Sequence, residues 1–490
     1  MTVDATGNWS PNPLIYEIYT ALWLNDLSAR HGREVTLANV PDAEWEAIAA
    51  LGVDAVWLMG VWERSPAGVA VALANERLLA DFRQALPDFT PADVIGSAYC
   101  IRRYVVDARF GGPDGLAVAR TQMRRHGLRL ILDYVPNHVA HDHPLASEQP
   151  ELFVRGDDDD LAAHPEAFVR IGEQVLACGR DPFFPAWPDV VQLNAFNTAM
   201  RATTVATLSR IAEQADGVRC DMAMLLINRI FGQTWGQRAG VAPEEEFWPE
   251  VIQAVRSAHL DFLFIAEAYW DLEWELQQQG FDYCYDKRLY DRLLYEDATS
   301  VRDHLAGDAG YQRHLVRFIE NHDEPRSNAA FAPERLHAAA LTALTASGAR
   351  LLYEGQLEGR RNQPPVFLNR RVPEEPDPPL LAGIHRSRLG NGAWRMLPTS
   401  GWPDNQRHEQ LLAWSWQGAP GSPHVLVIIN FAGQAAQGVV QVPWDDLSGR
   451  TWQLHDQLTG IEYVRDGTTM TDDGLYVELD AWNSHLFTVQ

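Results

Sequence analysis

The sequence has little positive charge, few cysteines and no long apolar run, and each shortage excludes a class of protein. Lysine and arginine together number 40, against 66 aspartate and glutamate residues, so the formal net charge is -26. A chain this acidic repels nucleic acid and acidic membrane surfaces, and we expect neither as a partner. No stretch is apolar for long enough to span a bilayer. A neutral substrate fits this composition better.

Cysteine is scarce as well. The 4 cysteines are widely spaced and form no Cys-x-x-Cys pair. This spacing argues against a disulfide framework and against a zinc site, so we expect no metal and no cofactor. The first residues, MTVDATGNWSPNPL, lack the basic and apolar segments of a signal peptide. We therefore predict a cytoplasmic protein, while the sequence gives no indication of its oligomeric state.

The first three quarters of the chain alternate between two kinds of segment. From Leu14 to Gln356, short β-rich apolar runs are followed by amphipathic stretches, which is typical of βα units around a parallel sheet. The predicted strands are Leu14–Tyr19, Val53–Met59, Leu128–Val135, Gly217–Asp221, Phe262–Glu267, Phe281–Tyr285, Leu315–Glu320 and Arg350–Tyr353. The helices predicted between them include Asp42–Ala50, Asp114–His126, Thr198–Glu213, Pro243–His259 and Pro333–Ser347. This order predicts an α/β fold, the (β/α)8 TIM barrel.

Two segments are too long for plain βα loops. Val139 to Phe196 carries several prolines and little periodicity, and it predicts an inserted subdomain after the third strand. Its acidic run, Asp157–Asp160, is expected to be a solvated loop rather than a metal cage, because four consecutive carboxylates repel one another and cannot all converge on one ion. The other segment, Val61 to Ala98, is expected to be helical around Ala70–Gln84.

After Gly390 the pattern changes to short alternating strands separated by turn residues. These strands predict a C-terminal antiparallel β-sandwich. They are Gln410–Trp416, His424–Asn430, Gly438–Val442 and His485–Val489. The predicted domains are therefore a barrel over 1–138 and 197–390, an insertion over 139–196 and a sandwich over 391–490.

Carboxylates stand at the ends of four predicted barrel strands. The four segments are Asp133-Tyr-Val-Pro-Asn137-His138, Gly217-Val-Arg219-Cys-Asp221, Phe264-Ile-Ala-Glu267 and Phe318-Ile-Glu-Asn-His322-Asp323. The carboxyl ends of barrel strands meet on one face, so these side chains are predicted to converge. Cleavage of a glycoside needs one carboxyl group as acid and a second as nucleophile or base. One such residue alone could be a helix cap or an ion-pair partner, but four in barrel order indicate a site.

In this order the four segments resemble the signatures of the α-amylase family, glycoside hydrolase family thirteen. The resemblance covers the barrel, the insertion and the C-terminal domain. It implies that Asp221 is the nucleophile, Glu267 the acid/base and Asp323 the carboxylate that holds substrate hydroxyls. The supporting groups that it implies are His138, Arg219 and His322.

The loop Gly96-Ser-Ala-Tyr99 resembles the family's second-strand loop, so Tyr99 is expected to stack under the sugar at the cleavage point. Many relatives place Lys-His three and four residues after the nucleophile, where this chain has Met224 and Leu225. These two residues either pack under the fourth loop or form an apolar acceptor site. Asn137 and Asp189 match calcium ligands of some relatives, but two hard ligands are too few for calcium.

Two arginine-containing segments allow more than one interpretation. Arg102 and Arg103 could attract an anionic group of a substrate, or they could pair with carboxylates at the surface. At the exit of the eighth strand, four charged residues either touch acceptor sugars or pair with one another. They are Glu354, Glu358, Arg360 and Arg361.

The function that these residues predict is a retaining α-glycosidase acting on α-linked glucosides such as α-1,4 malto-oligosaccharides. The partner is therefore an oligosaccharide or an α-glucan. An α-glucanotransferase would use the same residues, with a sugar in place of water as acceptor. A noncatalytic sugar-binding relative is the third hypothesis, although such proteins typically lose a catalytic carboxylate.

Overall fold

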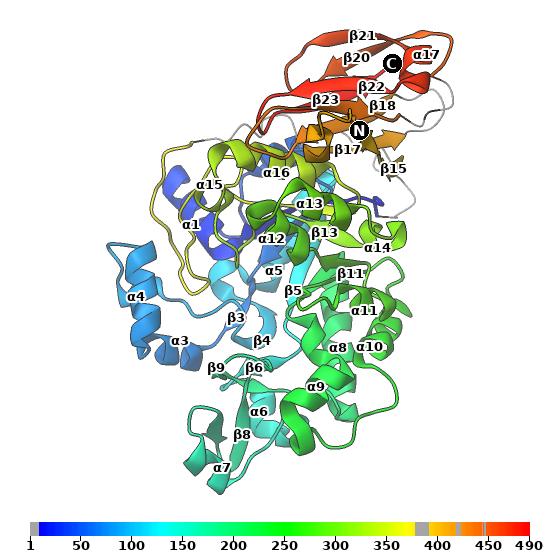
Figure 1. Ribbon diagram of the computed structural model, residues 1–490. Coiled ribbons are helices and arrows are strands. Elements are labelled where there is room, and N and C mark those ends of the chain that lie inside the picture. Colours follow the sequence, from blue (N-terminus) through cyan, green and yellow to red (C-terminus); the bar gives the residue numbers. More distant parts are fainter. Residues whose placement is uncertain (1–8, 378–391, 418–422, 443, 445–446) are drawn as a thin grey trace. The chain divides into compact units, whose positions relative to one another are not determined.

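Residues 9–377, 392–417, 423–442, 444 and 447–490 are described by the computed structural model (Figure 1). Their contacts divide the chain into two units. The first unit holds Met1–Trp9, Ile15–Tyr285 and Asn362–Glu374. The second holds Ser10–Leu14, Asp286–Arg361 and Glu375–Gln490.

In the described part of the chain, eight parallel strands close into a barrel in the order β1-β14-β13-β12-β11-β10-β5-β2. The strands are β1 (Leu14–Tyr19), β2 (Ala55–Met59), β5 (Arg129–Tyr134), β10 (Gly217–Cys220), β11 (Leu263–Ala266), β12 (Tyr283–Tyr285), β13 (Leu315–Arg317) and β14 (Ala349–Tyr353). Each coincides with one predicted strand, so the predicted TIM barrel is confirmed. The largest difference is at β13, which already ends at Arg317.

The barrel strands form because their residues can be buried on both faces. Every residue of β1 and of β2 is buried, as is typical of a parallel sheet that is covered on both sides. The few polar side chains within these strands are buried with the rest. Glu17 in β1 and Arg219 in β10 are 0% and 1% exposed. Such groups need partners inside the protein, and those of Arg219 are described below.

Helices lie between the strands where the sequence predicts them. They include α2 (Asp42–Ala50), α5 (Gly112–Arg125), α8 (Thr198–Gln214), α10 (Phe247–Arg256) and α16 (Pro333–Thr345). The side chain of Asn197 caps α8 by accepting the backbone N–H groups of Ala199 and Met200. Helices α8 and α10 pack against each other beside β10 and β11 (Figure 1).

The insertion after β5 is a four-stranded antiparallel sheet of order β6-β9-β8-β7. Its strands are β6 (His138–Ala140), β7 (Phe168–Ile171), β8 (Gln174–Gly179) and β9 (Trp187–Gln192). Two short helices, α6 (Pro144–Glu148) and α7 (Asp158–Ala163), accompany the sheet (Figure 1). These elements lie in the segment for which the sequence predicts an insertion, and the bounds 139–196 stay a prediction.

The acidic run Asp157–Asp160 is largely exposed, as predicted, but the prediction of a loop was wrong, because most of this run starts helix α7. Asp157 caps the helix by accepting the N–H of Asp160, and the carboxylate of Asp160 accepts the backbone N–H of Asp157. Asp160 also forms an ion pair with Arg238. Carboxylates are stabilised at a helix N-terminus by its free N–H groups, which offsets their mutual repulsion.

The segment after β2 contains the predicted helical part. Helices α3 (Pro66–Leu73) and α4 (Glu76–Ala85) lie between β3 (Trp62–Arg64) and β4 (Ile101–Val106), which pair with each other. A cluster of apolar side chains, with Phe82 and Leu368 at 0% exposure, holds this segment together.

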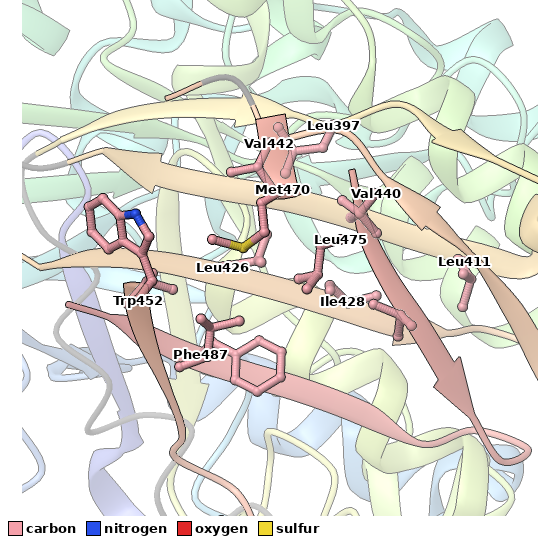
Figure 2. Close-up of a cluster of buried hydrophobic side chains, with 14 of the residues drawn as sticks. Leu397, Leu411, Leu426, Ile428, Val440, Val442, Trp452, Met470, Leu475 and Phe487 are labelled. Carbon is pink, nitrogen blue, oxygen red and sulfur yellow. The ribbon is translucent and has the colours of Figure 1, made fainter. Parts of the chain in front are cut away.

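The C-terminal residues form two antiparallel sheets. The larger has the order β15-β17-β18-β23-β20-β21, and the smaller has the order β16-β19-β22. Their strands are β15 (Ala393–Met396), β16 (Thr399–Ser400), β17 (Leu411–Gln417), β18 (His424–Asn430), β19 (Ala436–Val440), β20 (Thr451–Asp456), β21 (Glu462–Asp466), β22 (Leu475–Leu479) and β23 (Ser484–Val489). Figure 2 shows side chains of both sheets, such as Ile428 and Leu475, in one buried cluster.

The predicted C-terminal β domain is therefore confirmed as a fold. The boundary predicted at residues 390 and 391 lies outside the described residues, and the division into domains stays a prediction. No helix of the described chain combines the length and the apolar character that crossing a membrane requires.

Glycine at position 348 is required by its surroundings as well as by its backbone. Gly348 precedes β14 with φ +108°, and a Cβ there would lie 2.4 Å from the carbonyl oxygen of Leu315. We expect Gly348→Ala to lower the free energy of unfolding by more than about 3 kcal/mol, because backbone atoms would have to move. Urea denaturation of wild type and variant would measure this loss.

Gly449 provides the matched control, because it also has positive φ, +82°, but nothing lies within 4 Å of its Cβ position. Gly449→Ala should cost only the penalty of the left-handed backbone, about 1–2 kcal/mol. Equal losses for the two variants would contradict the role of the Leu315 carbonyl.

Candidate active site

Two predicted catalytic carboxylates follow neighbouring barrel strands. Strands β10 and β11 are parallel, and Cys220 pairs with Ala266 at their last positions. Asp221 and Glu267 come directly after these two residues, and the backbone N–H of Glu267 donates to the carbonyl of Cys220 at 3.0 Å. Both carboxylates are therefore held side by side by the ladder of the sheet.

The guanidinium of Arg219 binds both of these carboxylates. Its Nη1 lies 2.7 Å from Oδ1 of Asp221, and its Nη2 lies 2.8 Å from Oε1 of Glu267. Arg219 and Asp221 are two residues apart and point to the same face of the strand. Burial alone would lower the pKa of Arg219, but the carboxylate charges raise it well above its ordinary value. The cation therefore stays charged inside the barrel.

Aromatic rings surround the same guanidinium. Its carbon lies 5.4 Å from the ring centre of Trp57, 5.3 Å from that of Tyr99 and 5.6 Å from that of Tyr285. Aromatic faces attract cations, and these rings exclude water from the charged group. Tyr99 is partly exposed, as the predicted stacking residue must be.

Glu267 receives hydrogen bonds from two groups that the sequence analysis did not single out. The backbone N–H of Met222 donates to Oε2 at 2.5 Å, and the hydroxyl of Tyr269 donates to Oε1 at 3.0 Å. Met222 has a left-handed backbone, with φ 42° and ψ 44°. A side chain at positive φ is strained, and such strain often marks functional positions. Tyr269 stands only two residues beyond Glu267, so its closeness in sequence was a signal for its role.

His138, from β6, lies beside this group. Burial lowers the pKa of His138, although the charge of Asp221 and a hydrogen bond with the backbone of Tyr99 act in the opposite direction. Its ring centre lies 5.1 Å from that of Trp187. The first unit thus brings together Asp221, Glu267, Arg219, Tyr99 and His138 of the predicted site.

The remaining predicted site residues, His322 and Asp323, belong to the second unit. Nε2 of His322 lies 2.9 Å from Oδ2 of Asp323, and His322 is 3% exposed. The side-chain oxygen of Asn321 accepts the backbone N–H of Asp323, which fixes the turn after β13. The side chain of Asp323 is 41% exposed.

The Asp323 turn rests on a buried ion pair. Nη1 of Arg326 lies 2.7 Å from Oε1 of Glu320, and both side chains are fully buried. The guanidinium also lies 4.1 Å from the ring centre of Tyr353 in β14. This ion pair therefore holds the backbone before and after Asp323 in place, because Glu320 precedes Asp323 and Arg326 follows it.

Met224 and Leu225 are 0% and 3% exposed in the 3-10 helix Ala223–Leu226. Their burial favours the interpretation that they pack under the fourth loop, and their contact with an acceptor stays a prediction. Arg102 forms ion pairs with Glu63 and Asp142, which agrees with the surface interpretation of that arginine.

The two residues that resemble calcium ligands have other contacts. The side-chain oxygen of Asn137 accepts a hydrogen bond from Gln192 at 2.8 Å, and the carbonyl of Asp189 accepts one from Cys100 at 3.2 Å. The expectation that no metal binds stays a prediction.

The chain is similar in sequence or in fold to several known proteins. No model of a protein family matches the chain. The α-amylase MalA of Haloarcula japonica is 24% identical over 363 residues, which are 72% of this chain and 45% of that protein. The chain thus spans about half the length of this curated relative.

Solved structures share the fold over nearly the whole chain. The noncanonic maltogenic α-amylase AmyB of Thermotoga neapolitana is 18% identical with a TM-score of 0.66, over 98% of this chain and 99% of that one. The α-amylase of Lactobacillus plantarum is 19% identical with a TM-score of 0.66 over the same shares. The chain is therefore similar to members of the α-amylase family. The barrel and the carboxylates after its strands are features that the sequence predicted.

A histidine of the insertion should make this protein sensitive to acid. Burial, followed by the charges of Arg103 and Arg102, outweighs Asp142 and lowers the pKa of His143 to about 4. Its Nδ1 accepts the backbone N–H of Leu145 and so caps helix α6. In the unfolded chain, the His143 ring is protonated near the ordinary histidine pKa of about 6.5. The neutral ring of His143 therefore contributes fully to the free energy of unfolding above pH 6.5, and this contribution is lost as the pH falls towards 4.

His143→Asn keeps an acceptor at the cap but removes the titrating group. Between these two pH values, wild type should lose up to about 1.4 kcal/mol more per pH unit than the variant. Urea denaturation of both proteins at a series of pH values would measure the difference. Parallel stability curves would exclude His143 as a source of acid sensitivity.

Proposed function

We propose that this protein is a glycoside hydrolase, a retaining α-glycosidase that acts on α-linked glucosides such as α-1,4 malto-oligosaccharides. The observation that carries the proposal is the contact of one buried guanidinium, Arg219, with both Asp221 and Glu267. Retaining enzymes need two carboxyl groups about 5–5.5 Å apart, and a shared guanidinium favours such close spacing. The curated relative is an α-amylase, which supports an α-glucan as the substrate class.

In the first step, Glu267 gives a proton to the glycosidic oxygen while Asp221 attacks the anomeric carbon. Arg219 binds Oδ1 of Asp221, and we assign Oδ2 as the attacking atom. The C1–O bond to the leaving sugar breaks, and a β-linked glycosyl ester with Asp221 forms. In the transition state of this step the sugar ring carries an oxocarbenium-like positive charge, which the neighbouring carboxylates stabilise.

In the second step, Glu267 takes a proton from water, and the water oxygen attacks C1. The ester bond to Asp221 breaks, so the product has the α configuration of the substrate. Two inversions at one carbon give this retention. We assign Tyr99 to stacking beneath the sugar, and His138, His322 and Asp323 to its hydroxyl groups.

We also propose that the protein resides in the cytoplasm. Cys100, Cys178, Cys220 and Cys284 are all buried free thiols. Free cysteines are typical of proteins from a reducing compartment.

Incubation with maltotriose tests the activity. Hydrolysis should give maltose and glucose, with the newly formed reducing end in the α configuration when it is observed by NMR at early times. Release of the β anomer would contradict retention. Oligomers longer than maltotriose, formed before glucose accumulates, would identify a glucanotransferase that uses the same residues.

The roles of the two carboxylates are separated by substitution. Glu267→Ala should reduce turnover of maltotriose by roughly 10²–10⁴-fold but affect an aryl α-glucoside less, because that leaving group departs without protonation. Asp221→Ala should abolish turnover of both substrates, since no glycosyl ester can form.

Azide then identifies which step each variant has lost. In Glu267→Ala, azide should attack the glycosyl ester and give the α-glycosyl azide. In Asp221→Ala, azide should replace the missing nucleophile and give the β-glycosyl azide. The opposite pairing of variant and product, determined by NMR, would overturn the assigned roles.

A further inference from the structure

Tyr269 contacts the proposed acid/base from the loop that follows β11. Its hydroxyl donates a hydrogen bond to Oε1 of Glu267 at 3.0 Å, and the residue is half-buried. A hydrogen bond to a charged group is stronger than one between neutral groups. The contact therefore acts on the side chain whose proton the proposed reaction has to move.

The two oxygens of the Glu267 carboxyl group have different neighbours. Oε1 lies 2.8 Å from Nη2 of Arg219 and accepts the hydroxyl of Tyr269. Oε2 accepts the backbone N–H of Met222 at 2.5 Å. A proton on Oε1 would face both a cation and a hydroxyl donor, and the cation repels it. Oε2 is therefore the oxygen that better tolerates a proton.

The oxygen beside Arg219 also points away from the side on which a substrate binds. Arg219 is 1% exposed and stands two residues before Asp221, so its guanidinium lies deeper in the barrel than the strand end. Active sites of TIM barrels lie at the carboxyl ends of the strands. Oε2 of Glu267 is therefore the better placed oxygen for contact with a sugar.

The turn that carries Tyr269 is closed and strained. The carbonyl of Tyr269 accepts the backbone N–H of Leu272 at 3.3 Å. Trp270 and Asp271, which stand between them, have positive φ values of 63° and 61°. Side chains in this region of φ are strained, and they persist only where the surroundings enforce them. The backbone of Tyr269 is therefore held in one position.

The same turn packs against the insertion. The ring centres of Trp270 and Phe183 are 4.8 Å apart at an interplanar angle of 81°. Edge-to-face contacts between aromatic rings are favourable. Phe183 is fixed in turn, because Oδ1 of Asp181 accepts its backbone N–H at 2.6 Å. The hydroxyl of Tyr269 thus approaches Glu267 from a turn that the insertion supports.

We propose that Tyr269 positions the acid/base, because its hydroxyl bond to Oε1 keeps the proton of Glu267 on Oε2. This inference rests on the proposed function. In the first step, the O–H bond at Oε2 breaks and the proton goes to the glycosidic oxygen. In the second step, the same oxygen takes the proton from water. Tyr269 itself gives no proton to the sugar, so it is a positioning residue.

Other ionisable groups surround the same carboxyl group, directly or through Arg219 and Tyr285. They are Arg219 in β10, Asp221 after it, Tyr285 at the end of β12, Glu17 in β1, Tyr99 in the second-strand loop and His138 in β6. The cation favours the ionised form of Glu267, while the negative charge of Asp221 disfavours it. All of these groups remain when the hydroxyl of Tyr269 is removed. A change in pH dependence then reports that hydroxyl.

The test compares Tyr269→Phe with wild type, because phenylalanine keeps the ring and removes the hydroxyl. A hydrogen bond to a carboxylate favours the ionised form, so its loss lets Glu267 keep its proton to higher pH. The basic limb of the pH profile of kcat/KM for maltotriose should therefore move up by about 1 pH unit. At the optimum, kcat should fall roughly 5- to 10-fold while KM stays within about 2-fold, since ground-state contacts with the sugar are kept.

An aryl glucoside separates delivery of the proton from the rest of the reaction. The leaving group of 4-nitrophenyl α-glucoside departs without protonation, so kcat/KM of Tyr269→Phe on this substrate should stay within about 2-fold of wild type. A role in binding the sugar would instead raise KM for maltotriose and leave the basic limb in place. A merely structural role would lower activity on both substrates equally. Either of these two results would overturn the inference.

Tyr290→Phe is the matched control. Tyr290 is 1% exposed, and within the described part of the chain its hydroxyl has no hydrogen-bond partner. It belongs to the second unit, whereas Tyr269 and Glu267 belong to the first. Its substitution should leave the basic limb and the kinetics on both substrates unchanged.

Infrared difference spectroscopy follows the proton of Glu267 without any substrate. The carboxylic acid band that disappears with Glu267→Gln should persist to higher pH in Tyr269→Phe than in wild type. An unmoved band together with an unmoved basic limb would overturn the inference while the proposed function stands. A wild-type protein that cleaves neither substrate would refute the proposed function instead, and the infrared titration would still show whether the hydroxyl acts on Glu267.

Discussion

The buried contact of Arg219 with Asp221 and Glu267 is the interaction on which the site depends. A guanidinium that is 1% exposed has lost its hydration, and burial of an unpaired charge costs several kcal/mol. Here two carboxylates and a ring of aromatic side chains replace the water. Removal of any partner would leave uncompensated charge. The three groups therefore fix one another's positions.

This ion cluster also explains why the adjoining backbone is strained. The N–H of Met222 reaches Glu267 only because Met222 adopts a left-handed conformation. Beyond Glu267, Trp270 and Asp271 adopt the same rare region. Four residues other than glycine have positive φ in the described chain, and three of them, Met222, Trp270 and Asp271, lie within a few residues of the two carboxylates. The fourth is Trp482.

Much of the fold could be predicted from local signals. Apolar runs such as Leu14–Tyr19 are short, β-rich and bounded by polar residues, and the structure has β1 at the same positions. The sequence pattern failed at Asp157–Asp160, where a solvated loop was expected and most of the run starts helix α7. A capping interaction and the distant partner Arg238 offset the repulsion among these carboxylates. Only the first of these two contacts lies within the local sequence.

The sequence by itself determined the barrel order and the carboxylates at the strand ends, because strand periodicity and residue type are both local properties. It also indicated that Arg219 and Asp221 share a face, since two residues is the repeat of a strand. The tertiary structure decided that one guanidinium reaches Asp221 and Glu267 together, and that Phe183 meets Trp270. These partners are separated by tens of residues. Their contact follows from the closure of the barrel sheet and the path of the insertion, which no local pattern records.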